Sequence, residues 1–241
     1  MSRESRYYRA HGIVLRTYKL GEADRVIVFI TPERGEVRAV AKGVRKTKSK
    51  FGSRLEPLTH VSLQLYSGRG ELDLVTQVET IDHFRAIRED LDRLSKAISM
   101  LEAVDQVALP DEPAPDLYRM LLGGLRTLSE GDSALVSAGF FLKLLALEGA
   151  GPQVEACVQC GESEVVAFSA IDGGLTCRDH RRGIGLSPEA VVLIQNILGG
   201  QLGAALNEPP GPATQEVSVI AISALEHFLE RRMKTTSVLG G

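Results

Sequence analysis

The chain has 241 residues, of which 44% are hydrophobic and 24% charged, so it can bury a core in one large or two small domains and is neither fibrous nor disordered. The amino-terminal residues contain no apolar stretch of the signal-peptide kind, and the most apolar later segment, residues 133–149, contains Lys143 and is too short to cross a bilayer. We therefore expect a cytoplasmic protein without a membrane partner.

The net charge of −3 conceals an uneven distribution of charge along the chain. Residues 1–54 carry 14 lysines and arginines against five acids, a balance of +9, whereas the remaining residues carry 14 bases and 26 acids, a balance of −12. A strongly basic segment attracts polyanions such as nucleic acid. The amino-terminal part is therefore the candidate for a nucleic-acid contact.

From residue 7 to about residue 80, short apolar runs alternate with turn signals, a pattern typical of strands. The sequences ThrProGluArgGly at 31–35 and SerGlyArgGly at 67–70 are turn signals, because Pro fixes its own backbone angle and Gly accepts positive ones. The runs indicate about five strands, the number that a small closed barrel needs. We predict such a barrel over residues 1–81.

From about residue 82 the spacing of apolar residues becomes helical. One helical stripe comprises Phe84, Ile87, Leu91, Leu94, Ile98, Leu101 and Val104. Further helices are predicted at 117–128, at 134–147 with an end at Gly149, at 187–199 and at 217–229. In the fourth helix, Ser187 is the expected N-cap and Pro188 the first-turn residue. The prediction is an α+β chain with a barrel at 1–81, a helical domain at 82–150, a cysteine-bearing module at 151–186, and the rest of the helical domain at 187–241.

All three cysteines of the chain lie within 21 residues, in the pattern C-x2-C, sixteen residues, then C-x2-H, which comprises Cys157, Cys160, Cys177 and His180. This spacing matches the double-knuckle zinc pattern with one thiolate replaced by imidazole. A closed set of four such ligands leaves no position for water. The pattern therefore predicts one structural Zn²⁺ per chain.

The residues between the two pairs support a folded knuckle. They alternate in polarity and then turn at Asp172 and Gly173, so a hairpin can bring the second pair back to the first. Gly161 permits the positive backbone angle with which a knuckle turns its amide groups toward the sulfurs. The module is thus expected to fold around the metal.

Other interpretations of the cysteines remain. A CysValGlnCys pair can be redox-active, but the strand-to-helix setting of such motifs is absent and Cys177 would be unexplained. The cysteines can be small buried hydrophobes, although core packing gives no reason to gather all three. Asp172 or Asp179 is an alternative fourth ligand in place of His180. A base deaminase would need a H-x-E motif, and no His in the chain is followed by x-Glu.

The run LysGlyValArgLysThrLysSerLys at 42–50 connects the third and fourth predicted strands. Long basic side chains on a loop reach phosphates, and nearby aromatic rings stack on bases; Tyr7, Tyr8, Tyr18, Phe29, Phe51 and Tyr66 are the candidates. The predicted DNA contacts are Arg9, Arg16, Lys19, Arg25, Lys42, Arg45, Lys46, Lys48, Lys50 and Arg54. The alternative is a solvated loop above aromatic core residues, and Phe29, amid apolar neighbours, is expected in the core.

Catalytic motifs are missing from the sequence. It contains no GxxxxGK[ST], GxGxxG or GxSxG pattern, so we predict neither a nucleotide cofactor nor a catalytic serine. The acids Glu89, Asp90 and Asp92 are typical of the solvated face of a helix rather than of a paired catalytic set. We predict that the chain is not an enzyme.

Two segments resemble the bacterial RecO family of recombination mediators and DNA repair proteins: GIVLRTYKLGEADRVIVFITPERGEVRAVAKGVRK at 12–46 and FFLKLLALEGAGPQVEACVQCG at 140–161. The resemblance covers the whole chain. It implies an N-terminal OB fold, binding of single- and double-stranded DNA at the nucleoid, annealing of complementary strands, and, together with RecR, loading of RecA onto strands coated by SSB. His180 departs from the four-cysteine form of many relatives, and because some members lack the metal motif, the resemblance implies that zinc serves folding.

Two other classes of function remain as alternatives. A zinc-containing DNA-binding adaptor or transcription factor would bind DNA without speeding strand pairing. A metal-dependent nuclease or deaminase would turn over labelled DNA. An annealing assay separates the first class from a mediator, and product analysis separates the second.

Overall fold

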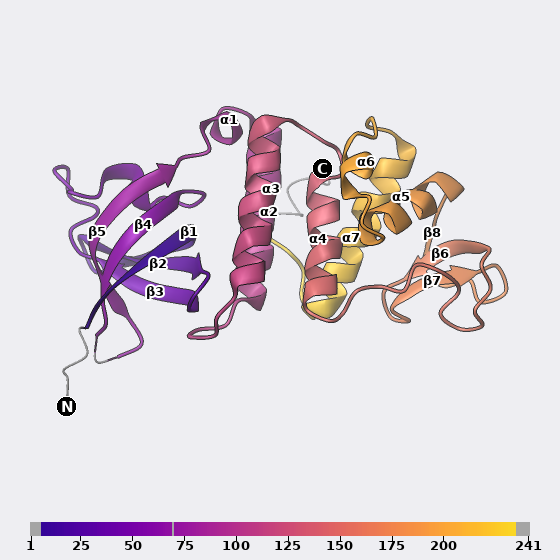
Figure 1. The fold of residues 1–241 in the computed structure, drawn as a ribbon, viewed down its shortest axis with the longest axis horizontal. Coiled ribbons are helices and arrows are strands. Elements are labelled where there is room, and N and C mark those ends of the chain that lie inside the picture. The colour runs from indigo at the N-terminus through magenta and orange to yellow at the C-terminus, as the bar shows by residue number, and fades with distance from the viewer. Residues whose placement is uncertain (1–5, 69, 235–241) are drawn as a thin grey trace. The chain divides into compact units, whose positions relative to one another are not determined.

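The structure of the chain is a computed structural model, which describes residues 6–68 and 70–234 (Figure 1). The chain divides into two compact units, with the boundary between Ser129 and Glu130. Within the described ranges, no helix has both the length and the apolar character needed to cross a membrane. The division drawn from the sequence, into 1–81, 82–150, 151–186 and 187–241, stays a prediction.

The first unit begins with a closed barrel whose strands follow the order β1-β2-β3-β5-β4, with β4 pairing back onto β1 (Figure 1). The strands are β1 (Tyr7–Leu20), β2 (Asp24–Thr31), β3 (Gly35–Ala41), β4 (His60–Tyr66) and β5 (Asp73–Asp82). Neighbours are antiparallel except β3 and β5, which run parallel and pair only at Ala39 and Val40. This five-stranded barrel is of the OB type, so the predicted fold class is confirmed. Of the predicted turn at 67–70, Arg69 lies outside the described residues.

The barrel interior is filled by the residues that alternate inward along each strand. Phe29 is fully buried there, as predicted from its apolar neighbours. The connection between β3 and β4 contributes Phe51 and Leu55, the latter at the end of the short 3₁₀ helix η1 (Gly52–Leu55), and both join the same core. The loop that carries the basic run is therefore fixed to the barrel at its apolar end.

Three helices complete the first unit: α1 (Arg85–Arg88), α2 (Leu91–Val107) and α3 (Pro115–Glu130). The sequence predicted one continuous stripe from Phe84 onward, and the structure corrects this. Asp90 starts a new helix, since its carboxylate accepts from the backbone N–H groups of Asp92 and Arg93, both at 3.0 Å. Because a new helix begins there, Leu91 does not continue the apolar stripe of Phe84 and Ile87, and its side chain is 80% exposed.

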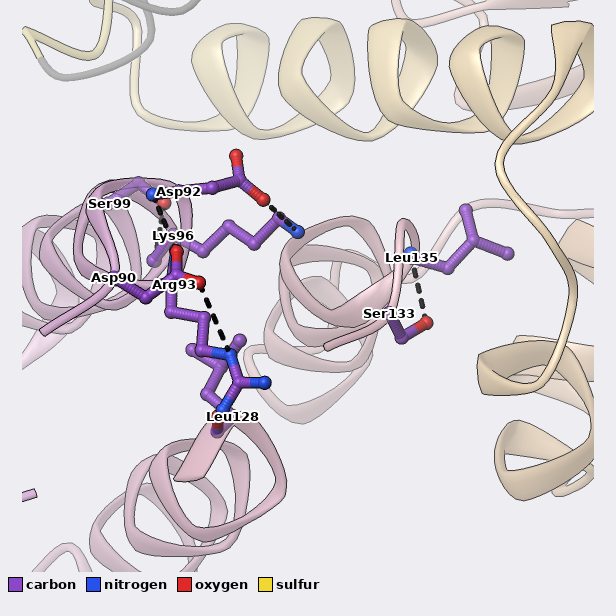
Figure 2. Close-up of polar contacts among 8 residues, drawn as sticks. All are labelled: Asp90, Asp92, Arg93, Lys96, Ser99, Leu128, Ser133 and Leu135. Carbon is purple, nitrogen blue, oxygen red and sulfur yellow. Dashed lines mark hydrogen bonds and ion pairs between the residues drawn. The ribbon is translucent and has the colours of Figure 1, made fainter. Parts of the chain in front are cut away.

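Polar contacts fix the N-terminal half of α2 (Figure 2). Asp92 and Lys96 form an ion pair at 2.6 Å one turn apart. Arg93 reaches from α2 to the end of α3, where its Nη1 donates to the carbonyl oxygen of Leu128 at 3.2 Å. Helices α2 and α3 are thus joined by a side-chain contact to the C-terminus of α3, where a cation is favoured.

The helices of the first unit are also bonded to its barrel. The N–H of Glu36 donates to the carbonyl of Leu109 at 3.0 Å, and His60 Nε2 lies 2.6 Å from the Tyr118 hydroxyl. Helix α2 packs against β1, whose outward residue Ile13 is fully buried. One outer surface of the barrel is therefore a packing surface, not a solvated one.

Over residues 130–234 the second unit has four helices and a small sheet in the order β7-β6-β8. Its elements are α4 (Val136–Leu147), β6 (Val165–Ser169), β7 (Gly174–Cys177), β8 (Ile184–Gly185), α5 (Pro188–Leu198), α6 (Leu202–Leu206) and α7 (Pro212–Phe228). Helix α4 is largely buried and packs against α5 and α7. The predicted cap is confirmed, since Ser187 Oγ accepts from the N–H of Ala190 at 3.3 Å. The short elements β8 and α6 were not predicted.

Candidate nucleic-acid surface and metal site

The four predicted metal ligands lie together at one end of the β6–β7 hairpin. The Sγ atoms of Cys157, Cys160 and Cys177 and a ring nitrogen of His180 all lie within 4.8 Å of one another. The Sγ atoms of Cys160 and Cys177 are 3.7 Å apart, and His180 Nδ1 lies 3.3 Å from Cys177 Sγ and 3.9 Å from Cys157 Sγ. The sequence spacing thus predicted a real cluster in space.

The local backbone explains why the cluster forms. Gly161 has a φ of 78°, as predicted, and its N–H donates to the Cys157 carbonyl at 2.9 Å, which closes the first knuckle. The hairpin turns at Asp172 and Gly173, with the Ser169 hydroxyl donating to the Asp172 carboxylate at 2.6 Å. Cys177 ends β7 and therefore returns beside the knuckle.

The geometry fits a tetrahedral zinc ion. Zn–S bonds of about 2.3 Å in a tetrahedron place two sulfurs about 3.8 Å apart, close to the separation of Cys160 and Cys177. That separation is far longer than the roughly 2.05 Å of a disulfide, and all three cysteines are free. Three thiolates with one imidazole are ligands that suit Zn²⁺, so the cluster could hold a metal ion.

The thiols also influence one another's protonation. Burial acts to raise the pKa of Cys157, but backbone N–H groups of Cys177, Gln159 and Cys160 outweigh it and lower this pKa to about 6. At Cys160, a backbone hydrogen bond at Glu162 lowers the pKa, yet burial and the neighbouring sulfurs leave it raised. Deprotonating the whole set without a cation is unfavourable, and a bound cation would remove that obstacle.

The basic loop between β3 and β4 is anchored against the turn between β1 and β2. Arg45 donates from its N–H to the carbonyl of Ala23 at 3.0 Å and from its Nη1 to the carbonyl of Glu22 at 2.8 Å. The N–H of Gly43 donates to the Asp24 carboxylate at 2.7 Å. These bonds hold the loop at one end of the barrel.

The bases of this loop and Lys19 of the adjoining strand end form what we call the basic surface: Lys19, Lys42, Arg45, Lys46, Lys48, Lys50 and Arg54, all exposed. Lys50 Nζ donates to the carbonyl of Thr76 on β5 at 3.1 Å and lies 4.8 Å from the Phe51 ring centroid. Arg54 Nη1 donates to the Lys50 carbonyl at 3.0 Å. Seven of the ten predicted DNA contacts are therefore brought together.

The other three predicted contacts are not part of this exposed group, although Arg25, half-buried, pairs with Lys19 across β1 and β2. Arg16 places its Nε 2.7 Å from both carboxylate oxygens of Asp105 on α2, and Arg25 Nη1 donates to the Thr17 hydroxyl at 2.8 Å. Arg9 is exposed on β1, more than half the strand away from Lys19. The role of Arg16 in joining strand and helix carried no signal in the sequence, because Asp105 is 89 residues away.

The strand order defines an OB-fold barrel, and the basic surface lies at one end of it. Helices and a Cys3His cluster follow in the chain. Barrels of this type bind oligonucleotides or oligosaccharides. The model of the Recombination protein O N terminal family matches residues 1–84, and that of the Recombination protein O C terminal family matches residues 88–237. The chain belongs to the recombination protein O family.

Curated relatives agree along the full length and are named DNA repair protein RecO. The chain is 41% identical to the one from a Nocardioides species over 238 residues, 95% of this chain and 97% of the relative. It is 42% identical to those from Frankia casuarinae and Thermobifida fusca, over 96% and 95% of this chain and 98% and 96% of the relatives. The family is thus one of DNA repair proteins, and its name describes recombination rather than a catalysed reaction.

Proposed function

We propose that this chain is a recombination mediator of DNA repair. It binds single- and double-stranded DNA in the cytoplasm at the nucleoid, anneals complementary strands and, together with RecR, helps to load RecA onto single strands coated by SSB. Family membership and the OB barrel support this proposal.

The observation that carries the proposal is the anchored basic loop. Its backbone is fixed at Ala23 and Asp24, so binding does not have to order the loop first. Lys42, Lys46 and Lys48 remain exposed on it and can reach phosphates. Contacts of this kind neutralise the DNA backbone without reading its sequence, which is what annealing of arbitrary complementary strands requires.

We propose that the Cys3His cluster holds one structural Zn²⁺ per chain. The sulfur and nitrogen separations support this assignment, and Cys157 and Cys177 are buried within the module. When bound, the ion supplies a crosslink between the first knuckle and the end of β7, in a module whose sheet has only three short strands. The four side chains close the coordination set, so the metal stabilises the fold and activates no water.

The decisive experiment is annealing of complementary single strands coated by SSB, followed by fluorescence transfer between strand labels. The full chain should accelerate duplex formation, and Lys46→Ala with Lys48→Ala should reduce the rate. The control is Arg85→Ala with Arg119→Ala, which removes the same charge from helix positions already paired with Glu89 and Asp116. Binding of DNA with no acceleration of pairing would support a DNA-binding adaptor instead.

A further inference from the structure

A second surface of the barrel carries side chains suited to nucleic acid, and it lies outside the basic surface. Its rows are set by strand register: Tyr7 of β1 pairs with Tyr66 of β4, and Arg9 of β1 pairs with Gln64 of β4, which in turn pairs with Gln77 of β5. We call these five residues the β1–β4–β5 face. Because neighbouring strands are paired at these positions, the side chains of each row stand side by side.

The two tyrosines form an aromatic platform in which Tyr7 is exposed and Tyr66 is half-buried. Their ring centroids are 4.9 Å apart at an interplanar angle of 61°, and Tyr7 is 54% exposed. Arg6 Nη1 donates to the Tyr66 hydroxyl at 3.4 Å, which places a cation at its edge. The next residue along β1, Tyr8, points the other way and packs against the barrel core. The platform is therefore not part of the interior.

Beside the platform the surface is hollowed. The hollow has a volume of about 150 Å³ and is lined by Arg9, Ser62, Leu63, Gln64, Gln77, Val78 and Glu79. Its polar groups include an arginine, two amides and a hydroxyl, with Glu79 as the acid among its described lining residues. Amide side chains both donate and accept, so they can pair with base edges, and the arginine can meet a phosphate.

This combination fits single-stranded nucleic acid better than a protein segment. Exposed aromatic rings stack on unpaired bases whatever their sequence, and a nearby guanidinium adds backbone contact. An apolar peptide would need a groove of apolar side chains, whereas this hollow is mainly polar. A duplex offers no free base faces to the tyrosines. Arg6 and Arg9 give the platform side the charge that a phosphate backbone requires.

The face and the basic surface are neighbouring surfaces of one unit. Arg9 and Lys19 are ten residues apart on β1, a path of about 33 Å along the strand. The two surfaces approach each other at β5, where Lys50 Nζ donates to the carbonyl of Thr76, the residue before Gln77. Both belong to the first unit, so the distance between them does not depend on any movement of the second.

We propose that the β1–β4–β5 face binds a second single strand of nucleic acid, so that one barrel holds two strands at once and annealing begins with a strand on each surface. This inference rests on the proposed function, because it takes the basic surface to be the first site. It assigns a ligand to a face of the barrel that the basic loop does not form.

The test compares the double variant Tyr7→Ala, Tyr66→Ala with the wild type, both as the full chain. The ligand is an oligothymidylate too short to span both surfaces, and native mass spectrometry counts the strands bound at saturation. The wild type should bind two strands per chain and the variant should bind one. Annealing of bare complementary strands should slow about tenfold, the effect of losing one stacked base. Affinity for the first strand should change less than about twofold. The matched control is Ile171→Ala with Val219→Ala, which removes exposed apolar side chains from the second unit.

A crosslinking measurement keeps the two proposals distinguishable. Bromodeoxyuridine-substituted strands should crosslink to peptides containing Tyr7 or Tyr66, and should still do so in Lys46→Ala with Lys48→Ala. One strand per chain in wild type, or unchanged annealing in the tyrosine variant, would overturn the second site while leaving the proposed function intact. Loss of binding to a protein partner with unchanged strand number would make the face a protein interface and overturn the inference too. A wild-type chain that binds no DNA would instead refute the proposed function.

Discussion

Removing Lys46 and Lys48 is the sharpest test of the basic surface. Both side chains are exposed on a loop whose backbone is held by Arg45, Gly43 and the barrel core, so truncation to Ala leaves the anchors in place. We therefore expect normal folding and an unchanged melting temperature. Any loss of DNA affinity then reports a lost phosphate contact rather than a damaged barrel.

The magnitude follows from counterion release. Each phosphate neutralised on a single strand contributes about 0.7 to the slope of log affinity against log salt. Two lost contacts should flatten that slope by about 1.4. If the variant and the wild type bind equally at 1 M salt, this difference in slope makes the variant about 25-fold weaker at 0.1 M salt, or roughly 2 kcal/mol.

The assay is fluorescence anisotropy of a labelled single strand across a series of salt concentrations. Arg85→Ala with Arg119→Ala serves as the control, because it changes the net charge equally at exposed helix positions. The control should keep the wild-type slope. An unchanged slope in the lysine variant, or an equal change in the control, would show that the DNA lies elsewhere or responds only to net charge.

Three further predictions follow from contacts described above. The double variant Cys157→Ser, Cys160→Ser should lose the one zinc per chain that we expect, and residues 151–186 should become sensitive to protease, whereas the control Gln159→Ala should keep the metal. Metal analysis and limited proteolysis measure both effects. A zinc-free variant that resists protease would contradict a structural metal. Arg16 and Asp105 should show a coupling of about 0.5–1 kcal/mol in a double-mutant cycle of unfolding, because Arg16 is part-exposed, and additive effects would refute the ion pair. Burial first, and then the charges of His11 and Arg126, lower the pKa of His60 to about 4. Between pH about 6.5 and about 4 the unfolded chain therefore binds more protons than the folded chain, so the free energy of unfolding should fall as the pH drops through that window. His60→Gln should make this fall smaller. The control His83→Gln, at an exposed position, should leave it unchanged.

The sequence predicted those features that depend on neighbouring residues. The five strands, the Ser187 cap, the hairpin turn at Gly173 and the positive φ of Gly161 follow from local chemistry, and the structure confirms each of them. The metal cluster was predictable because the two ligands of each pair are separated by two residues and a hairpin joins the pairs. Such signals need no knowledge of the rest of the chain.

Features that depend on distant partners could not be predicted. The contact of Arg16 with Asp105 arises only when α2 packs on β1, so the sequence around Arg16, a predicted DNA contact, gave no sign of it. The row of Arg9, Gln64 and Gln77 likewise exists only through barrel closure. The break before α2 was missed because Phe84 and Leu91 fit one helical period, while the capping carboxylate of Asp90 overrides it.

The bonds between barrel and helices set where the chain can be cut. Ile13, Val28 and Ile30 point away from the barrel interior and are nevertheless fully buried, and the backbone of Glu36 is bonded to Leu109 beyond the end of α2. A fragment ending near residue 84, where the first family match stops, would leave this apolar side uncovered and is expected to aggregate. A fragment extended to Ser129 keeps the covering helices. Failure of the shorter piece to bind DNA would then report a solubility defect, and would say nothing about which strands hold the nucleic acid.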